Sequence, residues 1–317
     1  MQLRGIRFRP VCNASGGHGF FGEGYPYHQW WKYAGLTFEH CDFIAKTTTL
    51  DARPGNMPLK HDGITPKEWK PACIVVRPFQ GVVLNAVGLS GPGAAALLAD
   101  GRWQQRNSEP FFLSFMSVQP KTDDRLAEFK EFVVLLKRHL PEFSAPVGLE
   151  MNFSCPNAGI DPSSLINEVG SALDIAANLN IPLQAKFNAT VPVAAVCEVC
   201  KHCACDAITM SNTIPWGQLP EQINWHRLFG TPVSPLAHLG GGGLSGWPLT
   251  PIICEWIKTA RDHGFFKPIW ACGGITSRRA VAQVHQAGAR GVQLGVVAML
   301  RPWRMRSIIR YAYELFA

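Results

Sequence analysis

Short apolar runs that end in polar or glycine-rich residues recur along the 317-residue chain. The runs are rich in β-branched and aromatic residues, which is typical of β-strands. Eight strands are predicted, in this order: 41–47 (CDFIAKT), 82–87 (VVLNAV), 111–117 (FFLSFMS), 147–154 (VGLEMNFS), 182–188 (PLQAKFN), 206–212 (DAITMSN), 268–274 (PIWACGG) and 291–297 (GVQLGVV).

Longer stretches with apolar residues at helical spacing separate several of these strands. They cover 123–140, 163–180 and 277–288. The last stretch starts at Ser277, whose hydroxyl can cap a helix, and ends near Gly288. Strands that alternate with helices predict an α/β fold, and eight such strands favour a (β/α)8 TIM barrel.

The barrel is expected to occupy the whole chain, 1–317, as a single domain with an N-terminal extension before its first strand. Residues 48–81 and 213–248 are too long to be tight connections. Loops of that length usually act as lids or carry small extra elements, so we expect long lid loops at the C-terminal face of the barrel.

The C-terminal ends of the predicted strands carry the groups that could perform chemistry, because barrels of this kind place their active sites there. Glycine turns after strands seven and eight often hold a phosphate on backbone N–H groups. The strand ends supply two lysines, several amides, a thiol and glycine turns: Lys46, Asn85, Ser117, Asn152, Cys155, Lys186, Asn188, Asn212, Thr213, Gly273, Gly274 and Gly295.

Composition narrows the class of protein. Hydrophobic residues make up 47% of the chain, which suits a well-buried core, and the formal net charge is +7. The basic residues are scattered, so a nucleic-acid partner is not expected, whereas anionic small molecules suit this charge. The start of the chain lacks the apolar core of a signal peptide, and no apolar run approaches the roughly 18 residues of a membrane span. We therefore expect a cytoplasmic protein that does not enter a membrane.

Four of the ten cysteines lie together in CEVCKHCAC, 197–205. The spacing of Cys197, Cys200 and Cys203 is found in iron–sulfur and zinc sites, although no second cysteine group follows at zinc-finger spacing. The alternative is a helix that leads into the sixth strand. A non-enzymatic electron-transfer or interaction protein that uses Cys197–Cys205 is therefore kept as an alternative, with no metal site as the expectation.

A glycine pattern, Gly241, Gly243 and Gly246, matches the spacing of a dinucleotide-binding fingerprint. That fingerprint requires a clean preceding strand and an acidic residue about 20 positions later, and both are lacking. We interpret these glycines instead as flexible backbone near a phosphate.

Several motifs together resemble the dihydroorotate dehydrogenases. They occur in the family's order as NASG (13–16), KTTTLDARPGNMP (46–58), LNAVGLSGPG (84–93), NFSCPN (152–157), AKFN (185–188), SNT (211–213), GGLSG (242–246), CGGITS (272–277) and GVQLG (291–295). The resemblance covers nearly the whole chain. It implies an FMN-binding barrel that oxidises dihydroorotate to orotate in de novo pyrimidine biosynthesis.

The resemblance also assigns roles to individual residues. Cys155 matches the catalytic base of the soluble class 1 enzymes, and Lys46 matches a lysine close to both flavin and substrate. Substrate contacts are implied for Lys46, Asn85, Asn152, Asn157, Asn212 and Thr213. FMN contacts are implied for Ala14, Ser15, Lys46, Lys186, Gly243, Gly273, Gly274 and Gly295.

The chemistry fits these roles. Oxidation removes a proton from C5 of dihydroorotate and transfers a hydride from C6 to N5 of the flavin, so a base and a flavin are needed on opposite faces of the ring. A thiol with an ordinary pKa of about 8.5 can act as that base, and asparagine amides match the alternating N–H and C=O groups of a pyrimidine. Another FMN-dependent pyrimidine oxidoreductase, similar to dihydropyrimidine dehydrogenase, is the alternative enzyme.

The sequence departs from the family pattern at two glycine-containing motifs. Val296 stands where a threonine often follows Gly295, and Gly91 stands where an asparagine is usual. Residues 17–33 are unusually aromatic and could form a lid, a subunit contact or an ordinary packed loop. The expected partners are a second copy of the chain and, as a candidate, an iron–sulfur electron-transfer subunit; the electron acceptor is left open.

Overall fold

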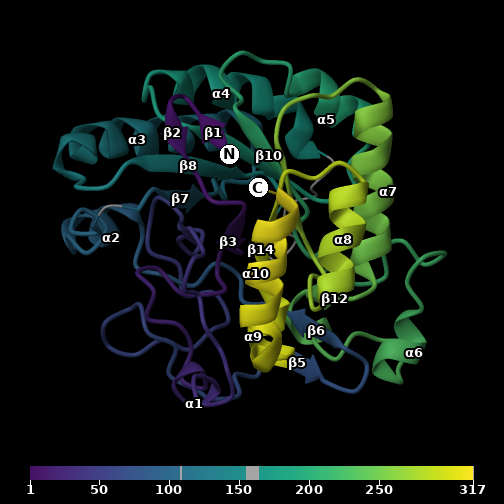
Figure 1. The fold of residues 1–317 in the computed structure, drawn as a ribbon. Helices are drawn as coiled ribbons and strands as arrows, with labels where there is room; N and C mark the ends of the chain where they lie inside the picture. Colours follow the sequence, from purple (N-terminus) through teal and green to yellow (C-terminus); the bar gives the residue numbers. More distant parts are fainter. Residues whose placement is uncertain (108, 155–163, 317) are drawn as a thin grey trace.

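The computed structural model describes residues 1–107, 109–154 and 164–316. Within these ranges, eight parallel strands form a sheet of order β3-β14-β13-β10-β9-β8-β7-β4 (Figure 1). The strands are β3 (Val11–Asn13), β4 (Phe43–Ile44), β7 (Phe111–Phe115), β8 (Val147–Asn152), β9 (Leu183–Phe187), β10 (Ala207–Met210), β13 (Ile269–Cys272) and β14 (Gly291–Leu294).

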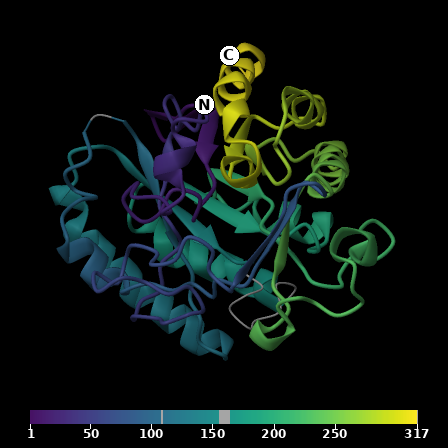
Figure 2. The same ribbon diagram turned by 90° about the horizontal axis from the view of Figure 1, so that it is seen from below.

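The sheet closes into a barrel between its first and last members. Cys12 of β3 and Asp42, just before β4, form a parallel bridge, and Asp42 N donates to Val11 O at 2.9 Å. Helices cover the outside of the strands, as the end-on view shows (Figure 2). The predicted (β/α)8 barrel is therefore confirmed.

The helices around the barrel follow the predicted periodic stretches. Residues 123–140 and 277–288 correspond to α3 and α8, and the Ser277 hydroxyl caps α8 by accepting from Ala280 N at 3.2 Å. The α-helices are α1 (His28–Trp31), α2 (Ala94–Ala99), α3 (Thr122–His139), α4 (Val169–Ala177), α5 (Val193–Val199), α6 (Trp225–Phe229), α7 (Leu249–Asp262), α8 (Arg278–Gln286), α9 (Val296–Leu300) and α10 (Met305–Phe316). Short 3₁₀ helices cover Leu140–Glu142, Ser164–Glu168, Ala237–Leu239 and Pro302–Arg304.

One predicted barrel strand lies elsewhere. Residues 82–87 do form a strand, β6 (Val82–Asn85), but β6 is antiparallel to its neighbours in a second sheet of order β11-β12-β6-β5. The other members are β5 (Ile74–Arg77), β11 (Ile214–Pro215) and β12 (Gly243–Gly246). The first barrel strand is instead β3, which the sequence prediction missed because three buried residues show no alternation.

The second sheet is built from the long insertions that were expected to be lids. β5 and β6 follow the second barrel strand, β4, whereas β11 and β12 follow the sixth, β10. The two insertions are joined by the pairing of β6 with β12, and the sheet lies at the lower end of the barrel in Figure 1. The segments that were expected to be lids therefore form an ordered sheet over one end of the barrel.

The opposite end of the barrel is closed by the N-terminal extension, a hairpin of β1 (Gln2–Leu3) and β2 (Ile6–Arg7). Leu3 and Phe8 pack in one buried cluster with residues that include Phe112 and Trp270. The rings of Phe8 and Phe112 stack at 4.5 Å. This end of the barrel is therefore an apolar plug, which leaves the other end for chemistry.

Inside the barrel, every second residue of a strand points inward, as the period of a β-strand requires. A middle layer of polar side chains is joined by hydrogen bonds across the strands, and its members are Ser114, Glu150, Gln184, Thr209 and Gln293. Two residues further along the strands lie Asn152, Lys186, Ser211 and Gly295, which reach the open end. Among the helices of the described ranges, none combines the length and apolar character that crossing a bilayer would need.

Candidate active site

The carboxyl ends of the barrel strands and the second sheet enclose a cavity of about 210 Å³. The structure brings most of the predicted site residues to its wall. They are Ala14, Ser15, Lys46, Asn85, Asn152, Lys186, Asn212, Thr213, Gly273, Gly274 and Gly295. Residues from strands distant in the sequence thus converge on one space, as expected for the mouth of a barrel.

Gly243 is not among the described residues that line the cavity. It lies in β12 opposite Asn85, and its carbonyl accepts from Asn85 Nδ2 at 3.3 Å. Ser245 is the residue of β12 that lines the cavity. Gly243–Gly246 forms strand β12, which is held by β6 and β11, so this part of the glycine motif is an ordered strand and not flexible backbone.

Two further predicted residues, Cys155 and Asn157, lie outside the described part of the chain. The described strand end that leads to them carries Asn152 and Ser154, both buried. Asn188, another strand-end amide, is buried away from the cavity and donates to Thr213 O at 2.6 Å. Asn188 therefore holds the Thr213 backbone in place by this hydrogen bond and does not itself line the cavity.

Lys46 presents a buried amine to the cavity. Its Nζ donates to Ser90 O at 2.5 Å and lies 4.7 Å from the centre of the Phe20 ring. Burial lowers the pKa of Lys46 to about 8, since desolvation disfavours the charged form. The amine is therefore cationic at neutral pH and loses its proton in the mildly alkaline range.

The amides of Asn152 and Asn212 orient each other. Asn152 Oδ1 accepts from Asn212 Nδ2 at 3.2 Å, and Asn212 Oδ1 accepts from the backbone N of Thr213 at 2.8 Å. Asn152 Nδ2 in turn donates to Thr47 Oγ1 at 3.2 Å. Amides fixed by such contacts can present donors and acceptors to a planar heterocycle in defined directions.

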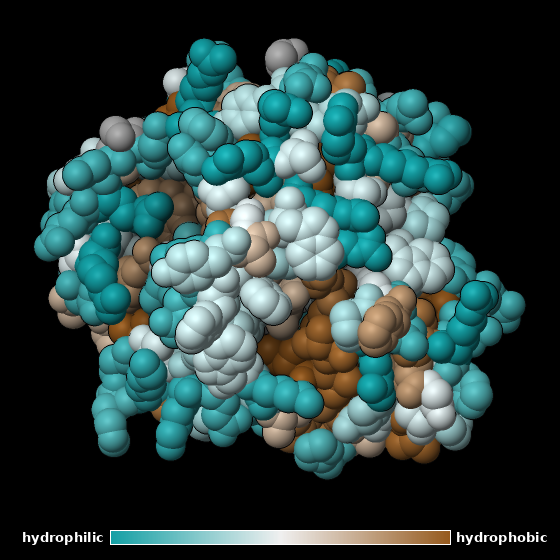
Figure 3. Space-filling view, turned by 60° about the horizontal axis from the view of Figure 1, so that its bottom comes forward, coloured by the Kyte–Doolittle hydropathy of each residue, from teal (hydrophilic) through white to brown (hydrophobic). Residues whose placement is uncertain are grey.

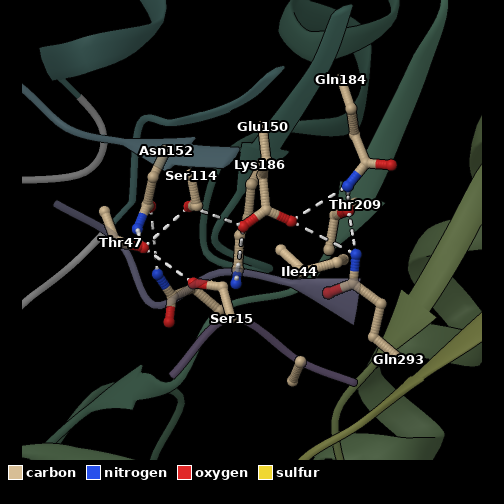
Figure 4. Close-up of polar contacts among 12 residues, drawn as sticks. Ser15, Ile44, Thr47, Ser114, Glu150, Asn152, Gln184, Lys186, Thr209 and Gln293 are labelled. Atoms are coloured by element: carbon tan, nitrogen blue, oxygen red, sulfur yellow. Dashed lines mark hydrogen bonds and ion pairs between the residues drawn. The ribbon is translucent and has the colours of Figure 1, made fainter. Parts of the chain in front are cut away.

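A line of hydroxyl groups runs from this amide pair into the barrel (Figure 4). Ser15 Oγ lies 2.7 Å from Thr47 Oγ1, which lies 2.9 Å from Ser114 Oγ. Ser114 Oγ donates to Glu150 Oε1 at 2.9 Å. The cavity wall is thereby connected to the polar layer in the centre of the barrel.

Glu150 is the most prominent residue that the sequence prediction missed. It is fully buried, and its carboxylate lies 3.4 Å from Lys186 Nζ. The amides of Gln184 and Gln293 donate to its Oε2 at 3.0 and 3.3 Å. The sequence could have indicated this position. Glu150 stands two residues before Asn152 on β8, so the two side chains point to the same side of the strand, toward the inside of the barrel.

Gly273 and Gly274 form a turn at the end of β13 that has no space for side chains. Both have positive φ, +137° and +70°. A Cβ on Gly273 would approach Ile253 Cδ1 to 2.6 Å, and one on Gly274 would approach Gly246 O to 2.6 Å and also collide with Thr250 Oγ1. Only backbone is therefore exposed here, so a ligand can approach the peptide groups closely.

The aromatic segment 17–33 supplies part of the cavity wall through Tyr25 and Tyr27. Their rings stack at 5.4 Å, and the Tyr25 hydroxyl donates to Gly16 O at 2.9 Å. The hydroxyl of Tyr27 is buried and has no hydrogen-bond partner among the described residues, so it can serve a ligand. The two tyrosines of this segment therefore pack against the site.

Apolar side chains complete the wall on the side of the second sheet. Figure 3, which brings the lower end of the molecule forward, shows an apolar hollow on this face. The aliphatic residues that line the cavity include Ile74, Val83, Val87, Leu89, Val296 and Met299. A ligand held here would contact polar groups from the barrel and apolar groups from the sheet.

The cysteine cluster lies at the other end of the barrel. Arg4 of the N-terminal hairpin donates to Ala204 O at 3.2 Å, beside Cys203 and Cys205. Cys200 and Cys205 are buried, whereas Cys203 is exposed. In the part of the chain that is described, no three His, Cys, Asp or Glu side chains are grouped as a metal ion would require.

Comparisons with known proteins agree with one another. The family profile described as "Dihydroorotate dehydrogenase" matches residues 1–311. A dihydroorotate dehydrogenase B (NAD(+)) catalytic subunit from Anoxybacillus flavithermus is 27% identical over 318 residues, covering 98% of this chain and 88% of that protein. A dihydroorotate dehydrogenase A (fumarate) from Lactiplantibacillus plantarum is 27% identical over 275 residues, covering 84% of this chain and 78% of that protein.

A solved structure shares the fold. The crystal structure of a DHODH from Eimeria tenella in complex with ferulenol matches with a TM-score of 0.67 and 17% identity. The match covers 99% of this chain and 82% of that one.

Proposed function

The chain belongs to the dihydroorotate dehydrogenase family, and we propose that it oxidises dihydroorotate to orotate in de novo pyrimidine biosynthesis with one bound FMN. The observation that carries the proposal is the convergence of two lysines, three amides and a side-chain-free glycine turn on one cavity.

The residues present suit FMN. The backbone of Gly273 and Gly274 would hold the phosphate, because this turn presents peptide groups without side chains at the cavity wall. Lys186 would lie at the edge of the flavin ring where negative charge collects on reduction. Ala14, Ser15 and Gly295 would complete the contacts. Val296 offers no hydroxyl to the phosphate, which leaves the backbone donors of the turns to bind it.

The substrate ring would be held by the amides. Asn85, Asn152 and Asn212 line the cavity together with Thr213, and the proposal adds Asn157 to them. Lys46, cationic at neutral pH, is suited to bind the carboxylate of dihydroorotate by a charge-assisted hydrogen bond.

The proposal gives the chain two tasks in catalysis. FMN, when bound, supplies a hydride acceptor for C6. The amides and Lys46 orient the ring, and the thiolate of Cys155 removes the proton from C5. The walls formed by Tyr25 and Ile74 limit the access of water to the reacting groups.

The decisive experiment is anaerobic. The purified protein is expected to be yellow and to lose its flavin absorbance when dihydroorotate is added. Dihydrouracil, which lacks the carboxylate, is the comparison. Bleaching by dihydrouracil but not by dihydroorotate would favour a dihydropyrimidine dehydrogenase-like activity, and protein without flavin would refute the proposal.

The proposal also extends to partners and location. It includes a homodimer, a candidate iron–sulfur electron-transfer subunit and a cytoplasmic location. The similar proteins comprise both NAD(+)-type catalytic subunits and a fumarate enzyme, so the reduced protein should be reoxidised in parallel with fumarate, NAD and artificial acceptors.

The affinity for orotate is expected to decrease as pH rises through about 8, because Lys46 is cationic only below its lowered pKa of about 8. The decrease should approach tenfold per pH unit at higher pH, the limit for loss of one proton. Titration of the flavin absorbance with orotate measures it. Lys46→Met should bind orotate roughly 10–100-fold more weakly at pH 7, the equivalent of one charge-assisted hydrogen bond, and should show a flatter pH profile. An unchanged pH profile in Lys46→Met would exclude Lys46 as the responsible group.

A further inference from the structure

The carboxylate of Glu150 lies at the centre of the barrel with no exposure to solvent. Its hydrogen bonds come from the Ser114 hydroxyl, from the amides of Gln184 and Gln293, and from the amine of Lys186, all of which are donors. This is the pattern of an ionised carboxylate, which can only accept hydrogen bonds. A buried charge of this kind is expensive to maintain unless it is paired.

Lys186, which forms the ion pair with Glu150, also reaches the active-site cavity. Lys186 is 4% exposed and lines the cavity, with its Nζ 3.4 Å from Glu150 Oε1 (Figure 4). Gln293 bridges the same carboxylate to the cavity wall, which it also lines. The hydrogen-bonded polar layer around Glu150 therefore holds the Lys186 amine in place, and the amine faces the cavity.

We propose that Glu150 is a positioning residue that holds Lys186 at the flavin and partly offsets its positive charge, and so lowers the reduction potential of the bound FMN. The inference rests on the proposed function, since it requires FMN in this cavity. Glu150 itself touches Lys186 rather than the cofactor or substrate.

The charges of Lys186 and Glu150 have opposite effects on the reduction potential of the flavin. A cation beside the flavin stabilises the negative charge of the reduced form, so Lys186 raises the potential. The opposite charge of Glu150 acts at a somewhat greater distance and cancels part of this effect. Removing the carboxylate charge should therefore make the flavin easier to reduce.

The test is Glu150→Gln, which preserves shape and removes the charge. At a fixed potential the ratio of reduced to oxidised flavin should increase by roughly tenfold, which corresponds to about 30 mV for a two-electron couple. The measurement is an anaerobic redox titration against a reference dye, which requires no turnover. Glu150→Asp keeps the charge but moves it away from Lys186, and should shift the ratio less, in the same direction.

The matched control is Glu168→Gln. Glu168 is also a buried carboxylate in an ion pair, 2.9 Å from the Arg125 guanidinium, and it does not line the cavity. This variant should lose stability and leave the flavin potential unchanged, which separates a general effect of a broken buried pair from an effect on the flavin.

The outcomes distinguish the inference from the function on which it rests. FMN-containing Glu150→Gln with an unchanged potential would overturn the tuning role, and so would an equal shift in Glu168→Gln. Failure of both Glu150 variants to hold FMN would assign Glu150 a purely structural role. Wild-type protein that holds no flavin would instead refute the proposed function.

Discussion

Replacing Cys155 by alanine is expected to slow the reduction of bound FMN by dihydroorotate by roughly 10²–10⁴-fold, the range for loss of a general base. FMN content and orotate binding should persist, because Lys46, Asn152, Asn212 and the glycine turn are unaltered. The measurement is stopped-flow bleaching of the flavin under anaerobic conditions. In the wild type the rate should rise with pH as the thiol ionises and then level off.

Two variants control this result. Cys155→Ser should fall between wild type and alanine, because a hydroxyl is a weaker base in the same place. Cys272→Ala removes another thiol that lines the cavity. Burial raises the pKa of Cys272 to about 11, so this thiol is protonated at neutral pH and its removal should change the rate little. Equal rates in wild type and Cys155→Ala at every pH would eliminate Cys155 as the base.

Gly274→Ala is expected to abolish most FMN binding, with occupancy after desalting reduced by at least about tenfold. The added Cβ would collide with Gly246 O and Thr250 Oγ1, and φ is +70°. The turn must therefore shift, and the backbone N–H groups move away from the phosphate. The ratio of flavin to protein absorbance and a titration of the apoprotein with FMN measure the loss.

Gly240→Ala is the matched control for backbone strain. Gly240 has φ +85°, and nothing lies within 4 Å of its ideal Cβ. It should therefore lose about 1 kcal/mol of stability from backbone strain alone and retain FMN. Full FMN occupancy in Gly274→Ala would show that the phosphate is held elsewhere.

The barrel could be predicted from the sequence because most of its strands carry apolar runs with polar ends. β8 and β9 show how well this works, since their predicted and observed positions nearly coincide. Such runs do not specify which sheet a strand joins. Val82–Asn85 has the composition of a barrel strand, yet it pairs with β5 of its own insertion and with β12 of the other insertion. β3 was missed because three residues are too few for a pattern.

The site could be predicted in part for a related reason. Residues at strand ends, such as Lys46 and Asn212, can be recognised as candidate site residues from their position in the sequence alone. The fold then brings them to one cavity. Glu150 was missed because a charged residue inside an apolar run is easily assigned to the outer face. Its role depends on partners from three other strands, Ser114, Lys186 and Gln293, which no local pattern reveals.

The pairing of β6 with β12 has a consequence for how the protein acquires its activity. Val82 pairs with Gly246 and Asn85 with Gly243, so the two halves of this sheet are separated in the sequence by the four barrel strands β7, β8, β9 and β10. Bringing such distant segments together is entropically unfavourable until the barrel holds both insertions close to each other. We therefore expect the binding cavity to be the last part of the molecule to assemble, so that added FMN would speed or stabilise only this final step of refolding.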